Sequence, residues 1–329
     1  MSEISLAELP SFNDVGAAAA RLAGWALRTP LLESPTLNAR LGLRLLLKAE
    51  PLQRTGSFKF RGAFNRLSML GPAERAAGIV AFSSGNHAQG VAHAATLLGI
   101  RSLIVMPQDA PAIKLANTRG YGAEVVTYDR WREDREAVAA RIAGERGSVT
   151  VKPYDDAAVI AGQGTVALEA VEQAKALGAE LDTFVVPAGG GGLTAGCVLA
   201  VTTMSPGTRI YTAEPVGFDD HARSLAAGER VTNDPAARTI CDALMAPTPG
   251  RMTFAINAPR LAGGVVASDD EVRHAMAIAF QEFKLVLEPG GAVALAAVLA
   301  GRLPDAKTVG VVASGGNVDP AAFAQSLRS

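Results

Sequence analysis

The chain has 329 residues, of which 49% are hydrophobic and 19% charged, so it can bury a large core divided between two lobes. Thirty-one basic and 32 acidic residues give a net charge of −1, which leaves no electrostatic excess for binding nucleic acid or an anionic membrane. Small-molecule chemistry is therefore the expected function class. We also expect a cytoplasmic protein, because the sequence contains neither a secretory signal nor an apolar run of membrane-spanning length.

Short apolar runs alternate with longer stretches rich in Ala and Leu along the whole chain. This rhythm is typical of parallel sheets covered by helices on both faces, and it predicts two α/β lobes. Strands are predicted at 43–48, 78–82, 102–106, 123–128, 183–186, 208–213 and 307–313. Helices are predicted at 88–98, 111–120, 131–145, 163–177, 193–203 and 270–284.

The first informative turn carries a lysine and reads Arg-Thr-Gly-Ser-Phe-Lys-Phe-Arg-Gly-Ala over residues 54–63. We expect Ser57 to cap a helix whose buried stripe includes Phe60 and Phe64, with Lys59 on a neighbouring face. A helical lysine is most often a solvated surface residue. Lys59, however, lies among phenylalanines and glycines, where loss of water lowers the pKa of an amine and frees its nucleophilic form.

Two further turns combine hydroxyls with glycines at the end of a predicted strand. Residues 83–87, Ser-Ser-Gly-Asn-His, also begin a helix, so their amides and hydroxyls form a nest suited to a carboxylate. A serine cap followed by a solvated histidine is the competing interpretation. Residues 312–317, Val-Ala-Ser-Gly-Gly-Asn, place one hydroxyl among glycines that allow a flat ring to approach, although a simple turn would look the same.

A run of four glycines at 189–192 follows a predicted strand and opens a helix. Its free backbone amides at a positive helix end suit a phosphate, and four glycines cost more conformational entropy than a simple connection requires. A dinucleotide site is the rival interpretation, because Gly190 to Ala195 fits G-x-G-x-x-A and Glu214 lies where a ribose-binding acid would. This segment alone does not separate the two.

A lysine, a phosphate cradle and a carboxylate nest are together what a pyridoxal-phosphate enzyme requires. In these turns the sequence resembles the fold-type-II pyridoxal-phosphate family, and specifically its threonine dehydratase and serine racemase group. The resemblance covers nearly the whole chain and makes a NAD-dependent oxidoreductase, or a non-catalytic cofactor-binding module, a distant alternative. It rests on six blocks in the family's order, at residues 55–63, 83–90, 161–165, 189–193, 288–292 and 314–319.

The resemblance implies a fold of two open, mainly parallel twisted sheets flanked by helices, with the cofactor between them. Residues 57–153 would form a small domain inserted in a large one made of 1–56 and 154–329. Lys59 would hold pyridoxal phosphate as a Schiff base. The other implied cofactor contacts are Phe58 beside the ring, Asn86 at the phenolic oxygen, Ser314 at the pyridine nitrogen, and Gly189, Gly190, Gly191, Gly192 and Leu193 at the phosphate.

The resemblance also implies substrate contacts. The substrate carboxylate would dock in the nest formed by Ser83, Ser84, Gly85, Asn86 and His87. Ser84 would in addition be a catalytic residue if the enzyme racemises, because it can protonate the face of Cα that Lys59 cannot reach. Arg135 matches a position that can meet an incoming carboxylate, although a solvated helix charge competes with this role.

Glu214 and Asp220 match acidic positions of metal-binding relatives, where Mg²⁺ or Mn²⁺ takes both carboxylates and the backbone oxygen of Phe218. Hard oxygen ligands suit such an ion. Paired acids six residues apart are also common on solvated surfaces, and the bulk of Phe218 leaves the shape of this loop open.

The implied activity is that of a dehydratase, or ammonia-lyase, which converts a small β-hydroxy-α-amino acid of the L-threonine or L-serine type to a 2-oxo acid and ammonia. The alternatives are a dehydratase of 3-hydroxyaspartate or phenylserine, and a serine racemase. The expected partners are the small substrate and a second copy of the chain in a homodimer.

Overall fold

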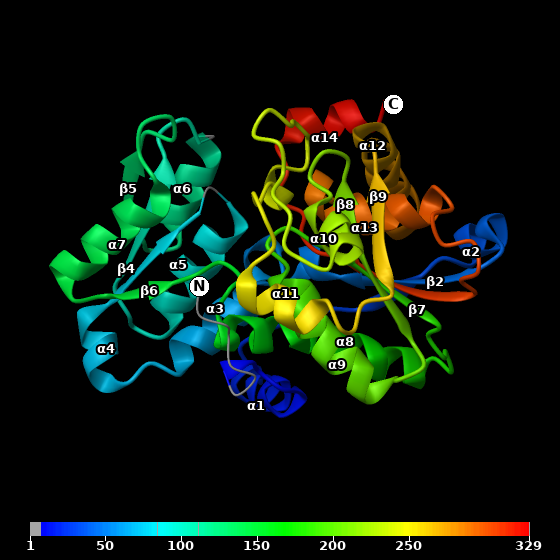
Figure 1. Ribbon diagram of the computed structural model, residues 1–329, viewed down its shortest axis with the longest axis horizontal. Coiled ribbons are helices and arrows are strands. Elements are labelled where there is room, and N and C mark those ends of the chain that lie inside the picture. Colours follow the sequence, from blue (N-terminus) through cyan, green and yellow to red (C-terminus); the bar gives the residue numbers. More distant parts are fainter. Residues whose placement is uncertain (1–7, 84, 111, 329) are drawn as a thin grey trace.

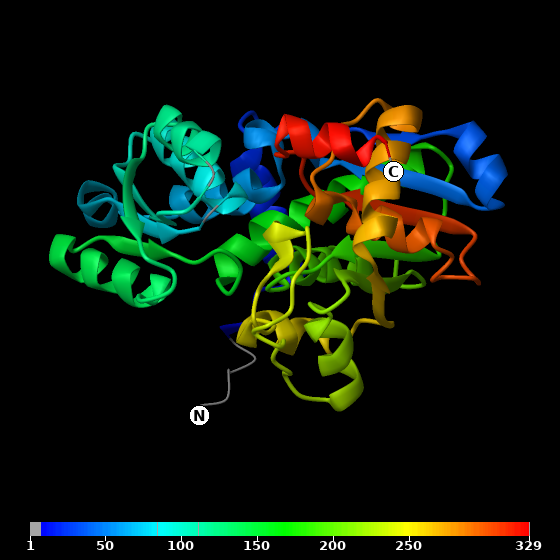
Figure 2. The ribbon, with the colours of Figure 1, turned by 90° about the horizontal axis from the view of Figure 1, so that it is seen from above.

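The computed structural model describes residues 8–83, 85–110 and 112–328. Two lobes, each built around its own sheet, lie side by side in Figures 1 and 2. No helix of the described chain has the length and apolar character needed to span a bilayer.

The larger sheet has six strands, and all its neighbouring pairs are parallel except the first, which is antiparallel. Its strands are buried on both faces: Leu45 and Leu47 point into one hydrophobic core, and Leu46 points into another. This double burial explains why the strands are nearly continuous apolar runs. In sheet order they are β1 (Leu31–Glu33), β2 (Arg44–Ala49), β10 (Thr308–Ala313), β7 (Thr183–Pro187), β8 (Arg209–Pro215) and β9 (Gly263–Ala267).

Helices pack on both faces of the larger sheet. One core includes residues of α1 (Phe12–Leu22), α8 (Ala157–Ala176), α9 (Gly192–Met204) and α11 (Arg251–Asn257), and the opposite core includes α12 (Asp269–Ile278) and α13 (Pro289–Leu299). The remaining elements outside the smaller sheet's core are short: α2 (Pro35–Leu41), η2 (Glu50–Leu52), η3 (Arg54–Gly56), α10 (Asp220–Ala227), η4 (Asp242–Leu244), the π-helical η5 (Ala279–Phe283) and α14 (Pro320–Ser326).

The smaller sheet has four parallel strands, in the order β5 (Glu124–Tyr128), β4 (Ser102–Pro107), β3 (Ile79–Phe82) and β6 (Val149–Val151). Alternate residues of β3 enter the two cores: one also holds α3 (Lys59–Ser68) and α5 (Asn86–Leu97), and the other α7 (Arg135–Arg146). The lobe also contains α4 (Pro72–Ala77) and α6 (Ala112–Gly120).

Helix α3 lies directly on α8, and glycines allow the approach. A Cβ atom added to Gly162 of α8 would lie 2.7 Å from the Cα of Gly62 on α3, which is closer than real Cβ contacts. In the same way, a Cβ on Gly164 would lie 2.7 Å from the carbonyl oxygen of Gly196 on α9. The helix that carries Lys59 is therefore fixed against the larger lobe backbone to backbone.

The strands and helices predicted from the sequence are confirmed, with differences at their ends. The predicted helix 163–177 begins earlier, at Ala157, and 131–145 begins later, at Arg135. The α-helix predicted over 270–284 ends at Ile278 and continues as a π-helical turn. Strands β1, β6 and β9 were not predicted. The lobe boundaries at 56/57 and 153/154 stay predictions.

Candidate active site

A single pocket brings together most of the residues predicted to bind cofactor or substrate. Its lining comes from both lobes and includes Phe58, Lys59, Ser83, Gly85, Asn86, His87, Arg135, Gly189, Gly190, Gly191, Gly192, Leu193 and Ser314. Ser84 lies outside the described residues, so its two predicted roles have no geometry here. The chemical roles of the other residues remain predictions, but their gathering in one place is observed.

Lys59 is the first residue of α3, and its Nζ donates a hydrogen bond to the carbonyl oxygen of Pro153 at 2.8 Å. Burial lowers the pKa of Lys59 to about 8, although the charge of Glu288 opposes the shift. The prediction that Ser57 caps this helix is wrong. Phe58 is the N-cap, and Ser57 instead forms a backbone bridge to Gly315 beyond β10. A cap at Ser57 would have started the helix one residue earlier, at Phe58.

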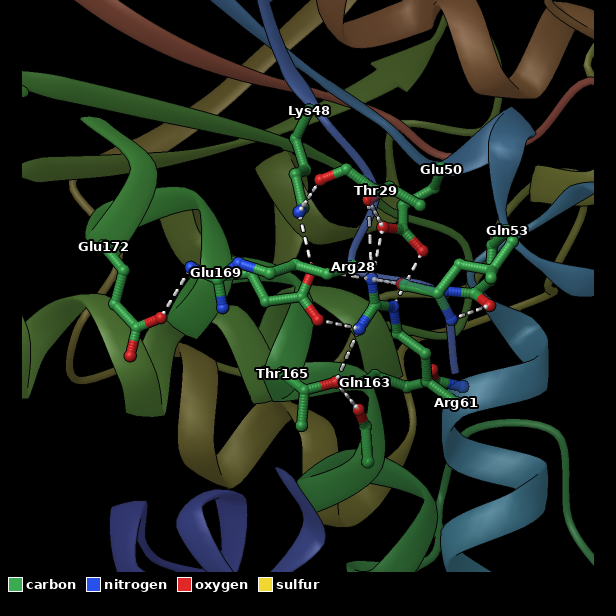
Figure 3. A network of polar contacts seen from close by, with 12 residues as sticks. Arg28, Thr29, Lys48, Glu50, Gln53, Arg61, Gln163, Thr165, Glu169 and Glu172 are labelled. Atoms are coloured by element: carbon green, nitrogen blue, oxygen red, sulfur yellow. Dashed lines mark hydrogen bonds and ion pairs between the residues drawn. The ribbon is translucent and has the colours of Figure 1, made fainter. Parts of the chain in front are cut away.

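Helix α3, which carries Lys59, is held to the larger lobe by a buried network of charges around Arg61, shown in Figure 3. Arg61 forms paired hydrogen bonds with Glu50, both at 2.8 Å, and with Glu169, at 2.7 and 2.9 Å. Lys48 donates to Glu169 at 2.6 Å and to the backbone oxygen of Thr29 at 2.7 Å. The charges of the two cations and the two carboxylates cancel. Together the four side chains connect α3 to α8, β2 and η2. Such bonds persist in the interior only when every charge is paired.

The four glycines form the turn between β7 and α9 on one side of the pocket. Gly191 has φ +89° and would clash with the ring of His221 if it carried a Cβ, which would lie 2.5 Å from Cε1. The carbonyl oxygens of Gly189 and Gly190 accept hydrogen bonds from outside the turn, from His221 Nε2 at 2.8 Å and Thr253 Oγ1 at 2.7 Å. A 13-residue helix starts at Gly192, so the amides of the turn form an anion site at its positive end. This backbone cradle fits a phosphate.

The carboxylate nest lies at the start of α5, opposite the loop that follows β10. Asn86 donates to Glu288 at 2.5 Å and accepts from Asn317 at 2.8 Å. Burial raises the pKa of Glu288 to about 7, assisted by the charge of Asp242. Burial also lowers the pKa of His87 to about 3, so its ring is neutral, and its Nδ1 has no partner among the described residues. An unpartnered buried nitrogen in a pocket wall is suited to a ligand's hydrogen bond.

The pocket also contains residues that the sequence analysis did not select: Lys114 of α6, Tyr154, Asp242 and Glu288. Only Glu288 gave any sequence signal, because it begins one of the six blocks. Tyr154 packs so tightly on the glycine turn that a Cβ on Gly190 would lie 2.4 Å from its ring. Lys152, two residues before Tyr154, is exposed and does not line the pocket.

Glu214 and Asp220 form a buried acidic pair at the end of β8 and the start of α10. Burial raises the pKa of both carboxyls, to about 6 for Asp220, and the charge of Asp220 raises that of Glu214 further. Glu214 accepts backbone hydrogen bonds from His221 and Ala222, at 2.7 and 2.8 Å. These bonds direct the Glu214 side chain toward the start of α10. Its carboxylate oxygens already accept these two backbone amides, which is not the role of a ribose-binding acid. The Oδ2 atom of Asp220 is buried without a partner in the described chain, and a carboxylate oxygen of this kind fits a hard cation such as Mg²⁺.

Comparison with known proteins identifies the family. A model of pyridoxal-phosphate dependent enzymes matches residues 23–315. The chain belongs to this family. The enzyme is 45% identical to L-threo-3-hydroxyaspartate ammonia-lyase of Pseudomonas sp., over 98% of this chain and 99% of the relative. It is 40% identical to serine racemase of Schizosaccharomyces pombe, over 97% of this chain and 98% of the relative.

Solved structures agree with the fold. The crystal structure of T.th. threonine deaminase superposes with a TM-score of 0.89 at 44% identity, covering 94% of this chain and 99% of the other. The fold-type-II resemblance is therefore confirmed, and the phosphate interpretation of the glycine turn stays a prediction that agrees with the family. The dinucleotide alternative is excluded by the family.

Proposed function

We propose that this enzyme removes water from a β-hydroxy-α-amino acid to give a 2-oxo acid and ammonia, and that its preferred substrate is 3-hydroxyaspartate. The first step releases the β-hydroxyl as water, and hydrolysis of the resulting imine then consumes one water and releases ammonia. The relatives named above support the reaction class. The observation that carries the choice of substrate is a guanidinium group, that of Arg135, in the pocket wall.

Arg135 is the first residue of α7, where Asp134 caps the helix. Its guanidinium lies 5.7 Å from the centroid of the Phe82 ring, which holds it beside the pocket. Within the described chain, no carboxylate forms an ion pair with Arg135, so its bidentate donors remain available to a ligand. A planar guanidinium is the preferred partner of a carboxylate, and 3-hydroxyaspartate offers a second one at Cβ.

The chain's own residues supply the remaining steps. Bound pyridoxal phosphate would act as the electron sink for negative charge at Cα. The nest at Ser83 to His87 holds the α-carboxylate. Lys59 would hold the cofactor and, as a free amine, would take the Cα proton; its lowered pKa suits this role near neutral pH. Ser314, which lines the same pocket, would offer the pyridine nitrogen a neutral hydroxyl, so the cofactor would be a weaker electron sink than one paired with a carboxylate.

The experiment compares kcat/KM for 3-hydroxyaspartate and L-threonine in the wild type and in Arg135→Ala. We expect the value for 3-hydroxyaspartate to fall by ten- to a hundredfold, since hydrogen bonds to charged groups contribute about 1.5–3 kcal/mol, and that for threonine by less than threefold. Arg132→Ala, which changes an 86% exposed arginine of the preceding loop, is the matched control. Equal losses for both substrates would show that Arg135 does not select a second carboxylate.

Racemisation is a second candidate activity, favoured by the relative named serine racemase. Lys59 reaches only one face of Cα, so inversion requires a proton donor on the other, and Ser84 is the donor that the motifs suggest. D-serine formation should then disappear in Ser84→Ala, with L-serine dehydration within about tenfold of the wild type. No D-isomer activity in the wild type would remove this candidate.

We also propose that Glu214, Asp220 and the backbone oxygen of Phe218 hold Mg²⁺ or Mn²⁺. The described residues contain no cluster of three or more His, Cys, Asp or Glu suited to a metal. A backbone oxygen would therefore have to complete the set. Support comes from the unpartnered Oδ2 of Asp220 and from the cost of two neighbouring buried carboxylates, which a divalent cation would offset.

A further inference from the structure

An ion pair joins the two lobes at the solvent side of the pocket. Lys114, on α6 of the smaller lobe, donates from Nζ to Oδ2 of Asp242, on η4 of the larger lobe. Both side chains line the pocket. Asp242 is 54% exposed and Lys114 19%, so the lysine reaches inward and its partner faces water. An incoming substrate would meet this pair before the residues deeper in the pocket.

The same lysine lies beside the carboxylate nest. A Cβ atom placed on Gly85 would lie 3.8 Å from Nζ of Lys114. The positive charge of Lys114 also acts on Glu288, whose side chain bonds to Asn86 of the nest. Because the amine ends a flexible four-carbon chain, a small rotation can move it from Asp242 to an anion in the nest.

We infer that Lys114 exchanges Asp242 for the substrate's α-carboxylate, and that Asp242 is an internal competitor which holds Lys114 when the pocket contains no substrate. The inference rests on the proposed function only for the place of the α-carboxylate in the nest. It assigns Lys114 and Arg135 different tasks: Lys114 acts on the carboxylate common to all α-amino acids, and Arg135 on the second carboxylate of one substrate.

The two models, internal competition and a purely structural ion pair, predict opposite changes in substrate affinity when Asp242 is removed. Removing Asp242 frees Lys114 and should strengthen substrate binding, whereas removing Lys114 should weaken it. If the pair only held the lobes together, both changes would weaken binding. An exposed aspartate that merely repelled anions would act in the same way whether or not Lys114 was present.

A double-mutant cycle separates these cases. KM and kcat are measured for L-threonine and 3-hydroxyaspartate in the wild type, Lys114→Met, Asp242→Asn and the double variant. We expect Lys114→Met to raise KM about tenfold for both substrates with kcat within twofold. Asp242→Asn should lower KM about two- to fivefold, as expected for breaking a partly exposed pair, and should change nothing in the Lys114→Met background.

The inference is overturned if Asp242→Asn raises KM, or if it lowers KM equally in both backgrounds. The matched control is Arg146→Met with Glu124→Gln, a pair of the same lobe that is 48% and 53% exposed and lies off the pocket. These changes should leave KM unaltered. L-alanine, which has the α-carboxylate but no β-hydroxyl, provides a test independent of turnover. Its dissociation constant, from the absorbance of the holoenzyme, should follow the same cycle even if no β-hydroxy substrate is consumed.

Discussion

Replacing Arg61 by methionine should destabilise the enzyme by about 3–5 kcal/mol, the usual cost of leaving a buried charge without its partner. The change removes the paired bonds to Glu50 and Glu169 and leaves two carboxylates facing one cation, Lys48. Glu50 is fully buried and the side chain of Glu169 is only 12% exposed, so water cannot replace the lost bonds. This loss is a large part of the 5–15 kcal/mol by which folded domains are normally stable.

Urea unfolding followed by circular dichroism measures the loss. Arg28→Met is the control, because Arg28 pairs with Glu172 in the same region but the two are 55% and 44% exposed, and such pairs contribute about 0–1 kcal/mol. Adding Glu50→Gln to Arg61→Met restores the charge balance and should recover part of the stability. A loss for Arg61→Met no greater than for Arg28→Met would refute the reasoning.

Acid provides a second readout of the same network. Burial alone would raise the pKa of Glu169, but the bonds from Arg61 and the charge of Lys48 lower it overall. The stabilisation is therefore fully present above the ordinary value of 4.5 and is lost as the pH falls through the lower, folded value. Most of this acid dependence should vanish in Arg61→Met.

Three further predictions concern the cofactor and metal sites. Lys59→Ala should abolish the yellow, borohydride-reducible adduct, and in the wild type the adduct should form faster as the pH rises through about 8, where the amine loses its proton; an adduct at another lysine would contradict the assignment. Gly191→Ala should weaken pyridoxal-phosphate binding at least tenfold in a fluorescence titration, because φ is +89° and a histidine ring fills the space, whereas unchanged affinity would show that the turn can adapt. EDTA should lower the melting temperature and Mg²⁺ restore it, by mass action on the folded state, but neither should act on a Glu214→Ala, Asp220→Ala variant; identical responses of variant and wild type would place any ion elsewhere.

Local sequence patterns predicted the central strands because each is buried on both faces and reads as an apolar run. They missed β1 and β6, which have three residues each, and β9, whose Gly263 and Gly264 lack strand-forming side chains. The helix predicted over 270–284 could not reveal its π-helical end, because that end is closed by Lys284 in the left-handed region (φ 59°), a conformation that a non-glycine residue rarely adopts and that the helical pattern does not signal.

The candidate site was predicted where chemistry is concentrated in a short turn, as at Lys59 and the four glycines. Lys114, Tyr154 and Asp242 were missed because each comes from a different segment and looks like an ordinary surface residue in its local sequence. Only the packing of the two lobes brings them to one pocket. The role of Ser57 was mistaken for a related reason: its partner, Gly315, lies 258 positions along the chain, and no local rule anticipates it.

Different parts of the chain line the two sides of the pocket, and this separation affects how substrate preference can evolve. The proposed phosphate cradle is made of backbone in a crowded turn, where almost any added side chain collides with a neighbour. The groups that we propose to meet the substrate, by contrast, are the ends of two long pocket-lining side chains, Arg135 and Lys114, carried on helices outside that turn. If these proposed roles hold, a single codon change would alter substrate preference without disturbing cofactor attachment. A scaffold arranged in this way can give rise to a set of lyases and racemases with different substrates from one ancestral gene.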